Sequence, residues 1–213
     1  MAKINMGILD GFIGKVGTVV GFKHFGKSIM RAYQKAVKNP RTAEQRLVRA
    51  KFGLLGRMGT ALLPAIDEGL APAAARKQLT PLNAFVQYNW RNTRGDDAES
   101  VSVDFTGVAL SLGSLQLPGF GTPDFGEELT VKVGYAPNSD VPGTDDDDAV
   151  YIAVYQPDSG QAVTSKAAKR SEGTVSVKVP STWSGLSVHT YGFAVGVGGR
   201  NSGTAYLGLG TIS

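Results

Sequence analysis

The sequence predicts an α+β protein, with an N-terminal β-hairpin and short helices followed by an antiparallel β-sandwich of immunoglobulin-like architecture. Three observations support this fold class. A segment rich in β-branched residues at 13–22 and a returning segment at 27–34 flank a turn near the N-terminus, and two helix-start patterns follow at Thr42 and Thr80. From about Ser100 onward, apolar residues alternate with a period of two, and 28 glycines in 213 residues suit short strands joined by tight turns.

The N-terminal hairpin is predicted from residues 13–34. Residues 13–22 are rich in valine and alternate loosely, residues 23–26 form a turn candidate, and residues 27–34 supply a returning strand. The glycines within residues 13–22 weaken the first strand unless another backbone packs closely against it.

A helix is expected to begin at about residue 43. Pro40 disfavours helical geometry at Asn39, so residues 35–41 should be an extended connector. Thr42 and Gln45 then form a capping-box pattern, in which each side chain satisfies a backbone N–H of the first turn.

Projection of residues 43–62 on a helical wheel separates an apolar side from an arginine side. Lys51 is the exception, since it points into the apolar side. The apolar side carries Leu47, Leu54, Leu55, Met58 and Leu62, with Val48 at its edge, and the arginine side carries Arg46, Arg49 and Arg57.

Further short helices are expected before the β-rich region. Residues 64–79 contain prolines and an alanine run, and Thr80-Pro81 predicts a second capped helix that extends to about residue 91. The polar residues 92–99 form the expected linker. The sequence thus predicts two domains, a hairpin-plus-helix region at 1–95 and a β-sandwich at 96–213.

The β-sandwich is predicted from a series of short alternating segments separated by turn residues. The likeness to immunoglobulin domains is architectural, because the chain has no cysteine and therefore lacks their disulfide. The expected strands are residues 101–105, 107–112, 127–135, 149–156, 161–166, 173–179, 188–198 and 203–211.

Charge is divided unevenly along the chain. Residues 1–95 hold 16 Lys/Arg and 4 Asp/Glu, a net charge of +12, whereas residues 96–213 hold 6 Lys/Arg and 14 Asp/Glu, a net charge of −8. This asymmetry indicates an anionic partner for the first half, or the acidic half of a like molecule, although uneven charge can also serve solubility alone.

Residue types that carry catalysis are sparse. Cysteine is absent, His24 and His189 are the two histidines, and no P-loop, G-x-S-x-G elbow or zinc spacing is present. The acidic run Asp145–Asp148 can be interpreted as a cation loop or as a solvated turn, and its lack of calcium-loop spacing favours the turn. We therefore expect no enzyme activity, no cofactor and no metal. Residues 1–21 have no long apolar run, so we expect neither a signal peptide nor a membrane partner, and a cytoplasmic origin.

The candidate contact surface is a basic segment. Phe22, Phe25 and Tyr33 are interleaved with its cations and could stack on bases, which suits nucleic acid. A protein interface or simple exposure to solvent explains the same cations at least as well. The residues predicted to contact the partner are Lys23, Lys27, Arg31, Lys35, Lys38, Arg41, Arg46, Arg49 and Arg57.

Several strings in the N-terminal region form a recognisable set, namely Gly14–Gly21 (GKVGTVVG), Gly26-Lys27, Asn39-Pro40-Arg41-Thr42-x-x-Gln45, Arg49–Phe52 and Leu82–Phe85. In these strings the chain resembles an uncharacterised family of proteins from Bacteroidota and from phages. The resemblance covers residues 1–92, and the C-terminal half fits the family only in being β-rich. The phage association implies a component of the virion or of its assembly.

We therefore expect a non-enzymatic structural or assembly protein of a bacteriophage particle, or a prophage-derived homologue, located in the virion or in the host cytoplasm during assembly. Its partners would be other virion subunits or a second copy of itself. The alternative is a sequence-tolerant nucleic-acid-binding protein that uses residues 23–57 to contact DNA. A calcium-dependent binding module is a third hypothesis.

Overall fold

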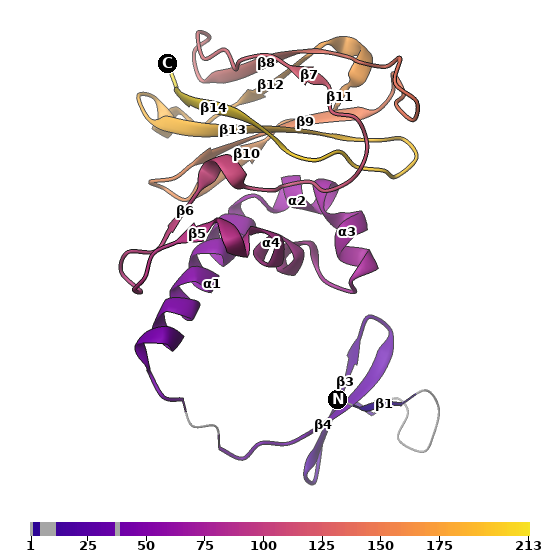
Figure 1. The fold of residues 1–213 in the computed structure, drawn as a ribbon, viewed down its shortest axis with the longest axis vertical. Coiled ribbons are helices and arrows are strands. Elements are labelled where there is room, and N and C mark those ends of the chain that lie inside the picture. Colours follow the sequence, from indigo (N-terminus) through magenta and orange to yellow (C-terminus); the bar gives the residue numbers. More distant parts are fainter. Residues whose placement is uncertain (1, 5–11, 37–38) are drawn as a thin grey trace. The chain divides into compact units, whose positions relative to one another are not determined.

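The chain forms two compact units, Met1–Arg41 and Thr42–Ser213. A computed structural model describes residues 2–4, 12–36 and 39–213 (Figure 1). The first unit is a small β-sheet, and the second contains helices and three further sheets, one of them a two-stranded sheet. The α+β fold class, with an N-terminal hairpin, short helices and an antiparallel sandwich, is confirmed.

The first unit is an antiparallel sheet with strand order β1-β4-β3-β2. Phe25 (φ 47°) and Gly26 (φ 73°) join β3 to β4, and positive φ at both residues is typical of a type I′ hairpin turn. The single strand expected at 13–22 is two strands, because Gly17 (φ 57°) turns the chain between β2 and β3. The strands are β1 (Ala2–Ile4), β2 (Gly14–Val16), β3 (Val19–His24) and β4 (Lys27–Ala32).

The helices begin where the sequence predicts them. Thr42 Oγ1 accepts a hydrogen bond from Gln45 N at 3.3 Å, and Thr80 Oγ1 accepts one from Asn83 N at 3.2 Å. In the described part of the chain, the α-helices are α1 (Ala43–Ala61), α2 (Leu63–Gly69), α3 (Ala71–Arg76) and α4 (Pro81–Asn89).

The apolar side of α1 is buried only in its second half. Leu55 and Met58 are buried, whereas Val48 and Phe52 are 52% and 55% exposed. Gly59 lies where α1 crosses α4, since a Cβ there would come within 2.7 Å of both Leu82 Cδ1 and Phe85 Cδ1. Close helix approach therefore explains the glycine at this position.

The C-terminal residues form two facing antiparallel sheets (Figure 1). The larger has the order β10-β9-β13-β14, with β11 also paired to β9, and the smaller has the order β12-β8-β7. Their strands are β7 (Gly119–Phe120), β8 (Thr130–Ala136), β9 (Ala149–Gln156), β10 (Gln161–Thr164), β11 (Ala168–Lys169), β12 (Thr174–Lys178), β13 (Ser187–Val195) and β14 (Ala205–Thr211).

Shorter elements connect the helices to this sandwich. Asp97 Oδ1 accepts hydrogen bonds from Glu99 N and Ser100 N, both at 2.8 Å, so the expected linker at 92–99 contains a structured turn. The elements are β5 (Thr93–Arg94) paired with β6 (Ser102–Val103), and the 3₁₀ turns η1 (Trp90–Asn92), η2 (Phe105–Gly107), η3 (Arg170–Glu172) and η4 (Ser181–Trp183).

The larger sheet is buried on both faces. Val150, Ile152 and Val154 of β9 pack between the two sheets, whereas Ala153 and Tyr155 pack against the helices. The helices thus form a third layer over the sandwich. The division expected at residue 95 is therefore not where the compact units separate, because residues 43–92 share a core with the larger sheet.

The strand expected at 107–112 is wrong, because this segment is held by side chains instead of a sheet. Thr204 Oγ1 accepts hydrogen bonds from Leu110 N and Ser111 N, both at 2.8 Å. The buried Asn89 binds both backbone groups of Ala109, with Oδ1 2.8 Å from its N and Nδ2 3.0 Å from its O. Satisfied backbone groups let the segment cross from the helices to the sandwich.

The acidic run Asp145–Asp148 has a structural role. The buried Asp148 carboxylate accepts a hydrogen bond from Arg170 Nε at 3.0 Å, and Arg170 is itself fully buried. Arg170 also donates to Pro137 O at 2.7 Å and to Gln116 O at 2.8 Å. One guanidinium therefore joins the start of β9 to the loop after β8.

Candidate interaction surface on the hairpin sheet

The strand register of the first unit places cations and aromatic rings on one face of the sheet. Lys15 is paired with Val20, Val20 with Arg31, Phe22 with Ile29, and His24 with Lys27, and directly paired residues share a face. Tyr33 follows Arg31 at the same alternation, and its backbone N donates to Thr18 O at 2.7 Å. We call this the cationic face, and it comprises Lys15, Val20, Phe22, His24, Lys27, Ile29, Arg31 and Tyr33.

Two cation–π contacts order this face. Lys15 Nζ lies 3.7 Å from the centroid of the Tyr33 ring, and Arg31 Cζ lies 5.8 Å from that of Phe22. A cation over an aromatic ring keeps its charge available at the surface while its apolar stem covers the ring. A hollow of about 500 Å³ lies beside these groups and is lined by Val20, Arg31, Ala32, Tyr33 and Gln34.

Few of the described residues of the first unit are buried. Within residues 12–36, Gly21 and Ile29 are the two buried residues. Phe12 packs over Gly21, where a Cβ would come 2.6 Å from the phenylalanine ring. By contrast, Ile13 and Val16 are 71% and 62% exposed. This sheet therefore presents apolar side chains as well as charge to its surroundings.

The predicted contact residues are divided between the two units. Lys27 and Arg31 lie on the cationic face, and Lys23 lies on the opposite face of the same sheet. Lys35 and Arg41 are exposed in the segment after β4, whereas Lys38 lies outside the described residues. The prediction missed Lys15, which only the strand register brings beside Tyr33.

The remaining predicted residues, Arg46, Arg49 and Arg57, are exposed on α1 in the second unit. Arg46 lines a hollow of about 510 Å³ together with the acidic residues Asp96, Asp97 and Glu99. Arg57 lines another of about 840 Å³ with Phe52, Tyr155 and Asp158. Arg46 and Arg57 therefore lie beside groups of their own unit, and the predicted contact residues are divided between the hairpin sheet, the segment after it and α1.

The two histidines differ in environment. His24 is exposed and its ring contacts Phe25 edge to face, with centroids 4.7 Å apart. His189 is stacked on Phe105 at 4.1 Å, and its Nδ1 lies 2.9 Å from Tyr206 Oη. Burial lowers the pKa of His189 below its ordinary value, so the ring is neutral at physiological pH.

The part of the chain that the structure describes contains no cluster of three or more His, Asp or Glu side chains arranged to hold a metal ion. Asp148 is engaged by Arg170, and Asp147 pairs with Lys169 at 2.8 Å. Within residues 2–4, 12–36 and 39–213, no helix combines the length and apolar composition needed to cross a bilayer.

The chain belongs to DUF6266, a family of unknown function, whose model matches residues 11–208. The match includes strands β2, β3 and β4 of the hairpin sheet and nearly all of the second unit, so the family model covers parts of both units. Comparison with curated proteins gives no match.

Proposed function

We propose that this protein is a non-enzymatic structural or assembly protein of a bacteriophage particle, or a prophage-derived homologue, and that it binds neighbouring subunits through its basic N-terminal sheet. The observation that carries the proposal is the four-stranded sheet of the first unit, in which Gly21 and Ile29 are the buried residues among those described between 12 and 36. The virion assignment rests on the resemblance of the N-terminal strings to phage-associated proteins.

A sheet of this size needs one face covered to be stable. Small isolated sheets are marginal in water, and antiparallel sheets normally pack one face on a core. Ile13, Val16, Phe25 and Tyr33 remain exposed in this unit. A neighbouring subunit that covers these side chains would supply the missing apolar burial, at about 25 cal/mol for each Å² removed from water.

Charge indicates the kind of surface that the neighbour offers. Residues 1–41 hold eight Lys/Arg and one Asp, a net charge of +7, and residues 42–213 hold 14 Lys/Arg and 17 Asp/Glu, a net charge of −3. The acidic unit of a second copy is a complementary surface for the basic sheet. Contact between unlike surfaces of successive copies builds a ring or an open array.

Sedimentation of the full chain at several concentrations tests this proposal. We expect association that weakens at high salt and that is lost when Ile13 and Val16 are both replaced by serine. Val197→Ser is the matched control, because Val197 is 69% exposed in the second unit. A strict monomer under all conditions would contradict self-assembly, and absence of the protein from purified particles by mass spectrometry would contradict the virion assignment.

Nucleic-acid binding is the second candidate, and the interleaving of cations with aromatic rings on the cationic face favours it. Such a surface can hold the phosphate backbone of a single strand while Phe22 and Tyr33 stack on bases. A salt titration of single-stranded DNA binding by the wild type and Tyr33→Ala decides the matter. Lack of affinity at low salt would end this candidate.

A further inference from the structure

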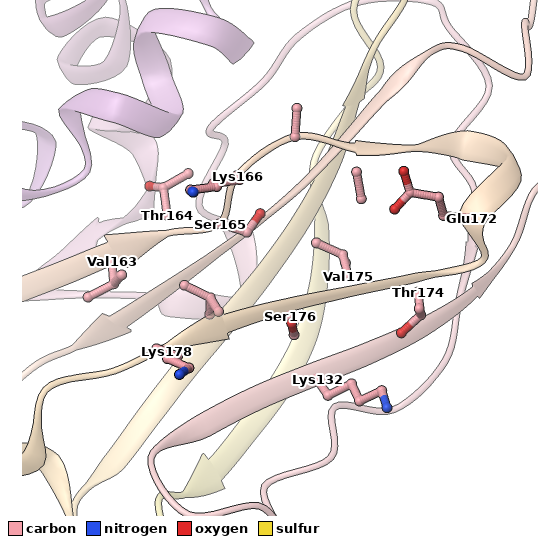
Figure 2. A pocket seen from close by; sticks show the side chains of 13 residues that line it. Lys132, Val163, Thr164, Ser165, Lys166, Glu172, Thr174, Val175, Ser176 and Lys178 are labelled. Atoms are coloured by element: carbon pink, nitrogen blue, oxygen red, sulfur yellow. The ribbon is translucent and has the colours of Figure 1, made fainter.

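A groove of about 720 Å³ runs between the open edges of the two sheets of the second unit (Figure 2). One side is β12, and the other is β10 with the residues that lead from it to β11. Lys132, from β8, lies beyond β12, and Glu172 lies at one end (Figure 2). The two sheets of the sandwich are therefore not closed against each other on this side.

Lysines gather at this groove in an otherwise acidic part of the chain. Residues 96–213 contain 14 acidic residues and six basic ones. Three of the six line the groove, and no described carboxylate forms an ion pair with any of these three. The three that line the groove are Lys132, Lys166 and Lys178, and the other three are Lys169, Arg170 and Arg200.

The outer edge of β12 carries backbone groups that pair with no other described residue. Tyr135 N donates to Gly173 O, and Val179 N donates to Leu129 O, both at 2.9 Å, so the odd-numbered residues of this segment face β8. In an antiparallel pair, the intervening residues direct their N–H and C=O groups away from the partner strand. Thr174, Ser176 and Lys178 thus present these groups at the edge.

Side chains of β12 alternate between an apolar and a polar side. Val175 and Val177 are buried in the core between the sheets, whereas Thr174, Ser176 and Lys178 are exposed. Lys132 lies directly across from Ser176 in the register. A strand added to this edge would meet valines with one set of alternate side chains and lysines with the other.

We propose that the edge of β12 binds an extended acidic segment of a partner protein by strand addition. The added strand pairs with the free groups of Thr174, Ser176 and Lys178, places small apolar side chains over the groove floor, and places carboxylates near Lys132 and Lys178. Glu172 lies at the opposite end of the groove and repels carboxylates. The acidic residues of the bound segment are therefore expected near Lys178 and not near Glu172. This proposal does not rest on the assembly function of the hairpin sheet.

The experiment measures fluorescence anisotropy of a short labelled peptide of alternating valine and glutamate with the full-length protein. We expect saturable binding that weakens as salt rises, and no binding of the matched valine–lysine peptide. Replacing Lys132 and Lys178 together by glutamate should weaken binding by more than about tenfold, because like charges then oppose each other. Replacing Arg76 on α3 and Arg91 on η1 together by glutamate is the charge-matched control and should leave the affinity unchanged, because both arginines are exposed and neither lines the groove.

Ser176→Pro separates strand pairing from simple charge attraction. Proline removes the outward N–H of Ser176 and leaves the pairing of β12 with β8 intact, since edge positions tolerate proline. We expect a loss of about threefold to tenfold in affinity, the effect of one backbone hydrogen bond, with an unchanged melting temperature. The paired lysine substitutions provide a second test if the proline variant fails to fold.

Three outcomes would overturn the proposal. Lack of binding of the acidic peptide at low salt removes it. If the wild type and a folded Ser176→Pro variant bind the acidic peptide with equal affinity, the groove attracts the peptide by charge alone and adds no strand. If the wild type does not bind the peptide and the Lys178→Val variant self-associates, the lysines prevent edge-to-edge pairing between copies and do not bind a partner.

Discussion

The two units of this protein are stabilised in different ways. In Thr42–Ser213, two apolar clusters lie on opposite faces of one sheet, and buried polar groups such as Arg170, Asn89 and Asn201 bind backbone atoms across the layers. In the first unit, Gly21 and Ile29 are the buried residues among those described between 12 and 36. A substitution in the second unit should therefore change folding, whereas one in the first should change association.

The largest effect is expected at the buried ion pair. Arg170→Met leaves the Asp148 carboxylate buried without its partner and removes the bonds to Pro137 O and Gln116 O. We expect a loss of about 3–5 kcal/mol in the free energy of unfolding, measured by urea denaturation. Lys169→Met is the neighbouring control, because its pair with Asp147 is exposed to solvent and should contribute little to stability. A loss of similar size in both variants would refute the role assigned to Arg170.

A smaller change in the free energy of unfolding is expected for alanine substitutions at two glycines of α1, with opposite signs. A Cβ at Gly59 would lie 2.7 Å from Leu82 Cδ1, whereas one at Gly56 meets nothing within 4 Å. Gly59→Ala should destabilise the second unit by about 1–3 kcal/mol through overpacking. Gly56→Ala should stabilise it by about 0.5–1 kcal/mol, because alanine favours the helix. Urea denaturation of both variants checks the sign, and stabilisation by Gly59→Ala would contradict the close packing of α1 on α4.

The pH dependence of stability should follow His189. Burial lowers the pKa of its imidazole from the ordinary value of 6.5. The unfolded chain therefore binds more protons than the folded chain once the pH falls below about 6.5, so the free energy of unfolding should decrease there and stay constant above. His189→Phe should remove this decrease in pH-dependent denaturation, whereas His24→Phe at the exposed histidine should retain it. An unchanged profile in His189→Phe would show that other groups control it.

Elements that depend on local sequence signals could be predicted, whereas those that depend on contacts between distant residues could not. Helix starts depend on local groups, so Thr42 and Thr80 identify α1 and α4 correctly. Alternation likewise identifies β8, β9 and β12, because their side chains face a core on at least one side. The segment at 107–112 alternates equally well but is held by Asn89 and Thr204, which are distant in sequence.

Tertiary packing also explains the two largest differences from the sequence-based expectations. The charge change near residue 95 marks a change in composition, but the helices before it pack on the sheet after it, and no local pattern carries that information. Lys15 joins the candidate surface through its register with Val20 and its contact with Tyr33. The Asp148–Arg170 pair is likewise invisible in the run of four aspartates, because its partner is 22 residues away.

The smallest effect on folding is expected in the first unit. Trp90 and Trp183 both belong to the second unit, so tryptophan fluorescence reports the unfolding of that unit alone. Val16→Ser should change the free energy measured in this way by less than about 0.5 kcal/mol, the usual range for exposed positions, while it weakens association in sedimentation. Leu55→Ala, in the core beneath α1, should lower the same free energy by about 2–5 kcal/mol. If Val16→Ser instead lowered the tryptophan-monitored stability as Leu55→Ala does, the first unit would contribute to the fold of the second, and the assignment of its exposed apolar residues to a partner would fail.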